Sequence, residues 1–125
     1  MAFVDTNILL RWLLNDHKEL SGRAETLISK AKLGSLIVTE LIAAEIVYVL
    51  RSTGRDRDQT SEALLLIRRT PALKYENDEL MLSIISLLTE TTLDFADCYL
   101  LARARREKTT LETFDNQLHK IHTTK

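Results

Sequence analysis

The chain has 125 residues, 45% of them hydrophobic and 28% charged, which is the composition of one ordinary globular domain spanning residues 1–125. Its formal net charge of −1 excludes a globally basic surface for nucleic acid. A single cysteine excludes an internal disulfide, and no apolar run approaches the length of a membrane span, so we expect a cytoplasmic protein without membrane contact.

Short apolar runs alternate with segments of helical periodicity along the whole chain. We expect strands at residues 2–5, 35–38, 72–75 and 109–113. Helices are expected at residues 8–15, 21–32 and 40–52, and further helices are expected to begin at Asp56 or Asp58, Asn77, Asp94 and Asp115. Strands that alternate with helices predict a helix-rich α/β fold with a parallel sheet.

Three aspartates stand where a helix cap is expected, namely Asp5, Asp94 and Asp115. Capping alone is a sufficient explanation for each of them. Asp5 and Asp115, however, also follow a predicted strand directly, at the edge where parallel sheets bind ligands. Both interpretations, a structural cap and a functional carboxylate, therefore stay open for these residues.

Glu45 and Asp97 are harder to explain as structural residues. The neighbours of Glu45 at helical spacing are Leu41, Ile42, Tyr48 and Val49. We expect Glu45 to lie on an apolar face, where an unpaired charge is costly and requires a cation, a proton or a metal. Asp97 has leucines at the equivalent positions, and we expect it to face inward as well, with a capping role as the alternative.

Carboxylates that converge at a sheet edge repel one another unless a cation lies between them. Oxygen-only ligands suit Mg²⁺ or Mn²⁺, and such a site suits phosphodiester hydrolysis. Thr6, Asn7 and Thr113 could orient ligands or bind phosphate, with local capping as the alternative. The candidates for contact with a nucleic-acid backbone are Arg11, Arg51 and Arg55.

Four short motifs occur in a characteristic order. They are Val4-Asp5-Thr6-Asn7, Ala44-Glu45, Asp94-Phe95-Ala96-Asp97 and Thr113-Phe114-Asp115. In this order the motifs resemble those of the PIN-domain ribonucleases, and most closely those of the VapC-type toxins of toxin–antitoxin pairs. The resemblance extends over nearly the whole chain.

The resemblance implies a three-layer α/β/α fold around a central parallel sheet. It implies that Asp5, Glu45, Asp97 and Asp115 form an acidic Mg²⁺ or Mn²⁺ cluster that cleaves RNA, with Asn7 and Thr113 as polar supports. It further implies a homodimer and a cognate antitoxin that occupies the site. Cys98 departs from the family pattern, because a small residue, commonly alanine, is usual beside the acid, and we expect it to be a small core residue.

Two other classes of protein are consistent with the same residues. One is a PIN-like interaction module that has lost its activity, which the complete acidic set argues against. The other is a phosphatase or a receiver-like domain. A phosphatase would require a second aspartate two positions after Asp5, where this chain has Asn7.

Overall fold

The fold comes from a computed structural model that describes residues 1–123. The chain forms two compact units, Met1–Asp78 and Glu79–Lys125, and each unit is described by itself. The single domain expected from the length of the chain stays a prediction. Within the described residues, no helix combines the length and the apolar character needed to cross a membrane.

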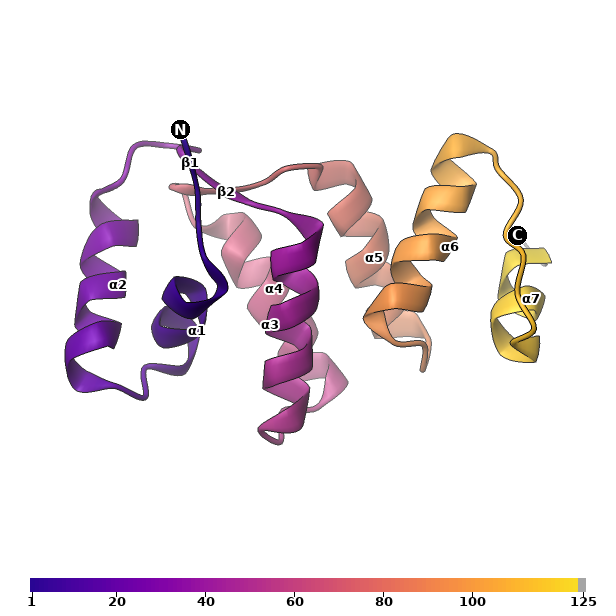
Figure 1. The fold of residues 1–125 in the computed structure, drawn as a ribbon, viewed down its shortest axis with the longest axis horizontal. Helices are drawn as coiled ribbons and strands as arrows, with labels where there is room; N and C mark the ends of the chain where they lie inside the picture. Colours follow the sequence, from indigo (N-terminus) through magenta and orange to yellow (C-terminus); the bar gives the residue numbers. More distant parts are fainter. Residues whose placement is uncertain (124–125) are drawn as a thin grey trace. The chain divides into compact units, whose positions relative to one another are not determined.

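The first unit is an α/β structure built on a small parallel sheet. Its elements are β1 (Ala2–Phe3), α1 (Thr6–Leu14), α2 (Lys18–Lys30), β2 (Leu36–Val38), α3 (Glu40–Ser52), α4 (Arg57–Arg69) and β3 (Leu73–Tyr75) (Figure 1). The strand order is β1-β2-β3, with β2 in the middle and both pairs parallel. In the register, Leu36 is opposite Ala2 on one side and Leu73 on the other. Two helices separate successive strands, as parallel pairing requires.

The core of the first unit lies between the sheet and its helices. Helix α1 packs against α2 and α3, and α4 packs against α3 and β3. Among the largest fully buried side chains are Val38, Ile46, Leu64 and Tyr75. The Tyr75 hydroxyl donates a hydrogen bond to the backbone carbonyl of Leu64 at 2.7 Å, so the one polar atom of this buried side chain is satisfied.

Helix boundaries in the first unit follow from local capping. Thr39 caps α3, as expected, through its hydroxyl and the N–H of Ile42. Asp56, and not Asp58, caps α4. Helix α2 begins at Lys18, earlier than the expected residue 21, because the imidazole Nδ1 of His17 accepts the N–H of Leu20 at 3.0 Å. A histidine acts here as the acceptor that serine, threonine or aspartate usually provides.

The second unit is helical over its described residues. It contains α5 (Asp78–Glu90), which begins at the last residue of the first unit, α6 (Phe95–Glu107) and α7 (Asn116–Thr123). Helix α6 packs against α7. Cys98 is fully buried, and its thiol donates to the backbone carbonyl of Leu93 at 3.8 Å, which confirms the expectation of a small core residue.

The expected fourth strand, residues 109–113, is wrong. This stretch is a loop between α6 and α7. Its first residue is used to close α6: the N–H of Thr109 donates to the carbonyl of Ala104 at 2.9 Å, after Lys108 has turned the chain with a φ of 54°. A strand also needs a neighbouring strand, and the described part of the second unit contains only helices.

Candidate active site

Asp5 stands at the carboxyl end of the first strand. The N–H of Val4 still bonds to the carbonyl of Ile37 beside it, at 3.0 Å, and α1 begins directly after Asp5. Asp5 occupies the N-cap position of α1 with an extended backbone, yet its side chain makes no capping hydrogen bond. The exposed carboxylate is therefore not explained by a structural cap and is available to a ligand.

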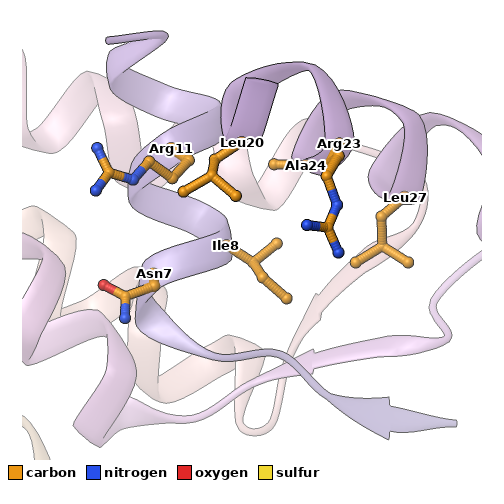
Figure 2. A pocket seen from close by; sticks show the side chains of 7 residues that line it. All are labelled: Asn7, Ile8, Arg11, Leu20, Arg23, Ala24 and Leu27. Atoms are coloured by element: carbon orange, nitrogen blue, oxygen red, sulfur yellow. The ribbon is translucent and has the colours of Figure 1, made fainter. Parts of the chain in front are cut away.

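Thr6 and Asn7 follow Asp5 in the first turn of α1. Thr6 is buried, and its hydroxyl has no hydrogen-bond partner in the structure. A buried hydroxyl in this state is costly, which points to a ligand or water as its partner. Asn7 is exposed and lines a groove between α1 and α2 (Figure 2). Both residues thus present polar groups beside Asp5.

Glu45 differs from the sequence expectation in its burial. The buried side of α3 is formed by Ala43, Ile46, Val47 and Leu50, whereas Glu45 is exposed. Its apolar neighbours Leu41 and Tyr48 are 79% and 75% exposed. The sequence pattern failed because α3 carries apolar side chains on two sides, and only one side packs into the core of the first unit.

Asp94, Asp97 and Asp115 belong to the second unit. The carboxylate of Asp94 caps α6 by accepting the N–H of Asp97 at 2.9 Å. The carboxylate of Asp115 caps α7 by accepting the N–H of Leu118 at 2.9 Å. Thr113 supports Asp115, since its hydroxyl accepts the N–H of Asp115 at 3.0 Å. The capping interpretation is therefore confirmed for Asp94 and Asp115, and each carboxylate keeps acceptor capacity beyond its cap.

Asp97 is half-buried and does not cap its own helix. Partial burial raises the pKa of its carboxyl, and the negative charges of Asp94 and Asp115 raise it further. The Asp97 carboxyl therefore experiences the negative charges of two neighbouring acids of its own unit. A cation at this position would relieve the repulsion that now disfavours the charged form of Asp97.

The candidate metal ligands fall into two pairs. Asp5 and Glu45 lie in the first unit, and Asp97 and Asp115 lie in the second. In the described part of the chain, no three His, Cys, Asp or Glu side chains are arranged so that they could hold a metal ion. The cluster of four acids therefore stays a prediction. Its donor chemistry, carboxylate oxygen throughout, fits Mg²⁺ or Mn²⁺.

The three arginine candidates have different surroundings. Arg11 lines the groove between α1 and α2 and pairs with Asp16 at 3.1 Å. Arg51 is exposed in the last turn of α3. Arg55 is held by the hydroxyl of Thr53 at 3.0 Å. Sequence reasoning missed a fourth arginine, Arg23, which lines the same groove as Arg11.

A protein-family model, the PIN domain, matches residues 2–123. The chain belongs to the PIN domain family. The match confirms the resemblance drawn from the four motifs. The parallel sheet of three strands and the helices of residues 1–123 are those of a helix-rich PIN fold, and they are consistent with the expected three-layer α/β/α arrangement.

No curated protein matches the chain. Among solved structures, the crystal structure of VapC20 from Mycobacterium tuberculosis, a Sarcin-Ricin loop cleaving toxin, is similar. It is 17% identical, the match covers 97% of this PIN domain and 95% of that chain, and the TM-score is 0.46.

Proposed function

We propose that this PIN domain is a metal-dependent endoribonuclease that acts as the toxin of a toxin–antitoxin pair. Membership of the PIN family supports a nuclease that acts on RNA. The observation that carries the proposal is that the carboxylate of Asp5 makes no capping hydrogen bond. Asp5 is an acid at the end of a parallel strand that stands in a cap position without using its carboxylate as a cap.

In the proposed site, Asp5, Glu45, Asp97 and Asp115 hold Mg²⁺ or Mn²⁺. These carboxylates would hold the ion, whose chemistry when bound would be to lower the pKa of water and to stabilise negative charge at the phosphodiester. The protein has two further tasks. Thr6 and Asn7 orient ligands beside Asp5, and Thr113 fixes the backbone of Asp115.

Binding of the RNA backbone is assigned to Arg11, Arg51 and Arg55. Because the net charge of the chain is −1, this binding depends on local cationic groups and weakens as salt is added. The resemblance to VapC-type toxins adds a cognate antitoxin, a homodimer and a cytoplasmic location to the proposal. Light scattering at micromolar concentration tests the dimer, and a monomer there contradicts it.

The deciding experiment is cleavage of structured RNA by wild type and by Asp5→Asn, with Mn²⁺, with Mg²⁺ and with chelator. Asp58→Asn serves as the matched control, because it removes an exposed carboxylate in the first turn of α4. We expect wild type and Asp58→Asn to give the same discrete products only with metal, and Asp5→Asn to give none while its melting curve stays cooperative.

An Asp5→Asn protein that cuts RNA as well as wild type would overturn the mechanism. A wild type that neither cuts RNA nor changes its melting temperature with Mn²⁺ would instead favour the inactive interaction module, because binding of a ligand to the folded state alone must stabilise it.

A further inference from the structure

A groove of about 410 Å³ runs between α1 and α2 (Figure 2). Its apolar surface comes from Ile8, Leu20 and Leu27. Three polar residues also line the groove, namely Asn7, Arg11 and Arg23, and of these Arg23 has its guanidinium between Ile8 and Leu27 (Figure 2). The groove begins two residues after Asp5, so it lies next to the strand end at which the proposed chemistry takes place.

The charge of this groove has one sign. Two arginines line it and no carboxylate does. Arg23 extends from α2 over the space between Ile8 and Leu27, and Arg11 lies beyond Leu20 at the other end (Figure 2). Arg23 is exposed and forms no ion pair with the described residues. A free guanidinium beside an apolar floor suits a ligand that is anionic at one end and flat and apolar at the other.

We propose that this groove is a nucleotide subsite for single-stranded RNA, an inference that rests on the proposed nuclease function. The base of one nucleotide lies on Ile8, Leu20 and Leu27, and its phosphate binds Arg23. The volume of the groove is within the range of about 300–1,000 Å³ that is usual for small-ligand sites. RNA is read mainly through unstacked nucleotides of this kind.

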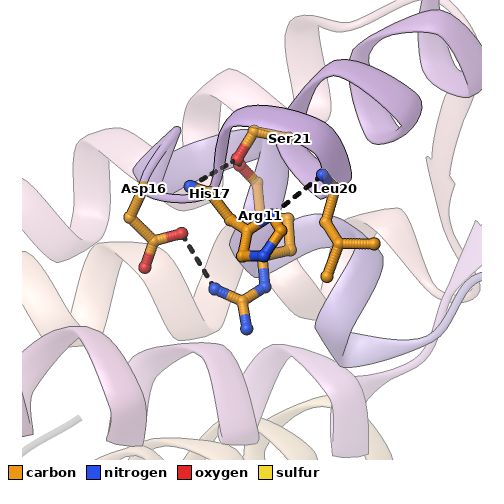
Figure 3. A network of polar contacts seen from close by, with 5 residues as sticks. All are labelled: Arg11, Asp16, His17, Leu20 and Ser21. Carbon is orange, nitrogen blue, oxygen red and sulfur yellow. Dashed lines mark hydrogen bonds and ion pairs between the residues drawn. The ribbon is translucent and has the colours of Figure 1, made fainter.

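Arg11 also lines the groove, but its guanidinium is paired with Asp16 and does not point to the proposed phosphate position. Its Nη1 donates to Asp16 at 3.1 Å (Figure 3). The backbone around it is fixed, because the hydroxyl of Ser21 donates to the Arg11 carbonyl at 2.8 Å and accepts the N–H of His17 at 3.2 Å. The guanidinium can therefore turn towards a phosphate in the groove without moving the helix, once Asp16 releases it.

The test measures the affinity for a single-stranded RNA oligonucleotide in chelator, in an Asp5→Asn background so that no cleavage can occur. Arg23→Gln should weaken binding about tenfold, the equivalent of one charge-assisted hydrogen bond. It should also lower the slope of log affinity against log salt by about 0.7, as the loss of one phosphate contact does. Asp16→Asn should strengthen binding about threefold by freeing Arg11.

The matched control is Lys30→Gln, which removes one positive charge from the same helix outside the groove. It should change the affinity less than about twofold. A second measurement locates the base: an RNA that carries 4-thiouridine should crosslink to the α2 peptides that contain Leu20 or Leu27. Crosslinks confined to other peptides would overturn the proposal.

The outcomes separate this inference from the proposed function. If wild type cleaves RNA but Arg23→Gln binds it as well as Lys30→Gln does, the subsite is wrong and the nuclease stands. If Arg23→Gln weakens binding but wild type neither cleaves RNA nor changes its melting temperature with Mn²⁺, the subsite stands and the nuclease is wrong. If a glutamate-rich peptide binds in an Arg23-dependent way and RNA does not, the groove is a protein-docking site and the inference is overturned.

Discussion

The carboxylate of Asp94 accepts the backbone N–H of Asp97 at 2.9 Å, so the cap of α6 and the neighbouring candidate metal ligand are joined through the main chain. The two carboxylates therefore have different tasks. Asp94 satisfies an N–H at the start of the helix, whereas the Asp97 side chain makes no cap and carries the raised pKa. We therefore predict that a substitution of Asp94 affects stability and that a substitution of Asp97 affects activity.

Replacing Asp94 by Ala should lower the free energy of unfolding by about 1 kcal/mol, the usual cost of losing an N-cap. Asp97→Asn keeps the N–H that the cap uses, so it should change stability by less than about 0.5 kcal/mol while abolishing cleavage. Urea unfolding followed by circular dichroism measures the first effect, and the RNA assay measures the second. Equal destabilisation by both variants would contradict the division.

Mn²⁺ should raise the melting temperature of wild type but not of Asp97→Asn. A ligand that binds only the folded state stabilises it by about 2.7 kcal/mol at one hundred times its dissociation constant. Burial raises the pKa of Asp97 most, and repulsion from Asp94 and Asp115 raises it further; a divalent cation would relieve this repulsion. A melting shift that is unchanged in Asp97→Asn would place the metal elsewhere.

Features that depend on a few neighbouring residues were predictable from the sequence. The caps at Thr39, Asp94 and Asp115 are correct because a cap requires only an acceptor followed by a helical segment. The strand β2 was predictable for the same reason, since Leu36–Val38 is an apolar run between Ser35 and Thr39, and β1 and β3 lie within the expected ranges 2–5 and 72–75.

Features that depend on the tertiary surroundings were not predictable in this way. Residues 109–113 have β-rich composition but no pairing partner in their own unit. The periodicity of α3 could not decide which of its two apolar sides packs inward, so the exposure of Glu45 was missed. The position of Arg23 in the groove was not predicted, because the groove exists only where α1 and α2 lie at a suitable distance. The spacing of Arg23 from Leu20 and Leu27 does, however, place all three on one side of α2.

Asp56→Ala should destabilise the first unit more than Asp58→Ala does. Asp56 forms a reciprocal capping box with Gln59: its carboxylate accepts the N–H of Gln59 at 2.8 Å, and the Gln59 side chain accepts the N–H of Asp56 at 2.9 Å. The expected loss is about 1 kcal/mol for Asp56→Ala. Asp58 lies in the first turn of α4 but is not its cap, so it contributes through the helix dipole and its removal should cost about half as much. Thermal melts of both variants check this, and a reversed order would refute the assignment of the cap.

Tyr75 should make the protein sensitive to alkali. Burial raises the pKa of its hydroxyl above the ordinary value of 10.0, with a further contribution from the charge of Asp78. Well below pH 10 the hydroxyl of Tyr75 is neutral in the folded and in the unfolded protein. At higher pH it ionises first in the unfolded chain, so the free energy of unfolding falls as pH rises beyond about 10.

The Tyr75→Phe variant tests this argument. Its free energy of unfolding at neutral pH should be lower by about 1 kcal/mol, because the hydrogen bond to Leu64 is lost. It should also show a shallower decline of stability between pH 9.5 and 11, in about the range where a free tyrosine titrates. Tyr48→Phe, at an exposed position, is the matched control and should follow wild type in urea unfolding at each pH. An identical alkaline decline in Tyr75→Phe and wild type would show that Tyr75 does not govern this sensitivity.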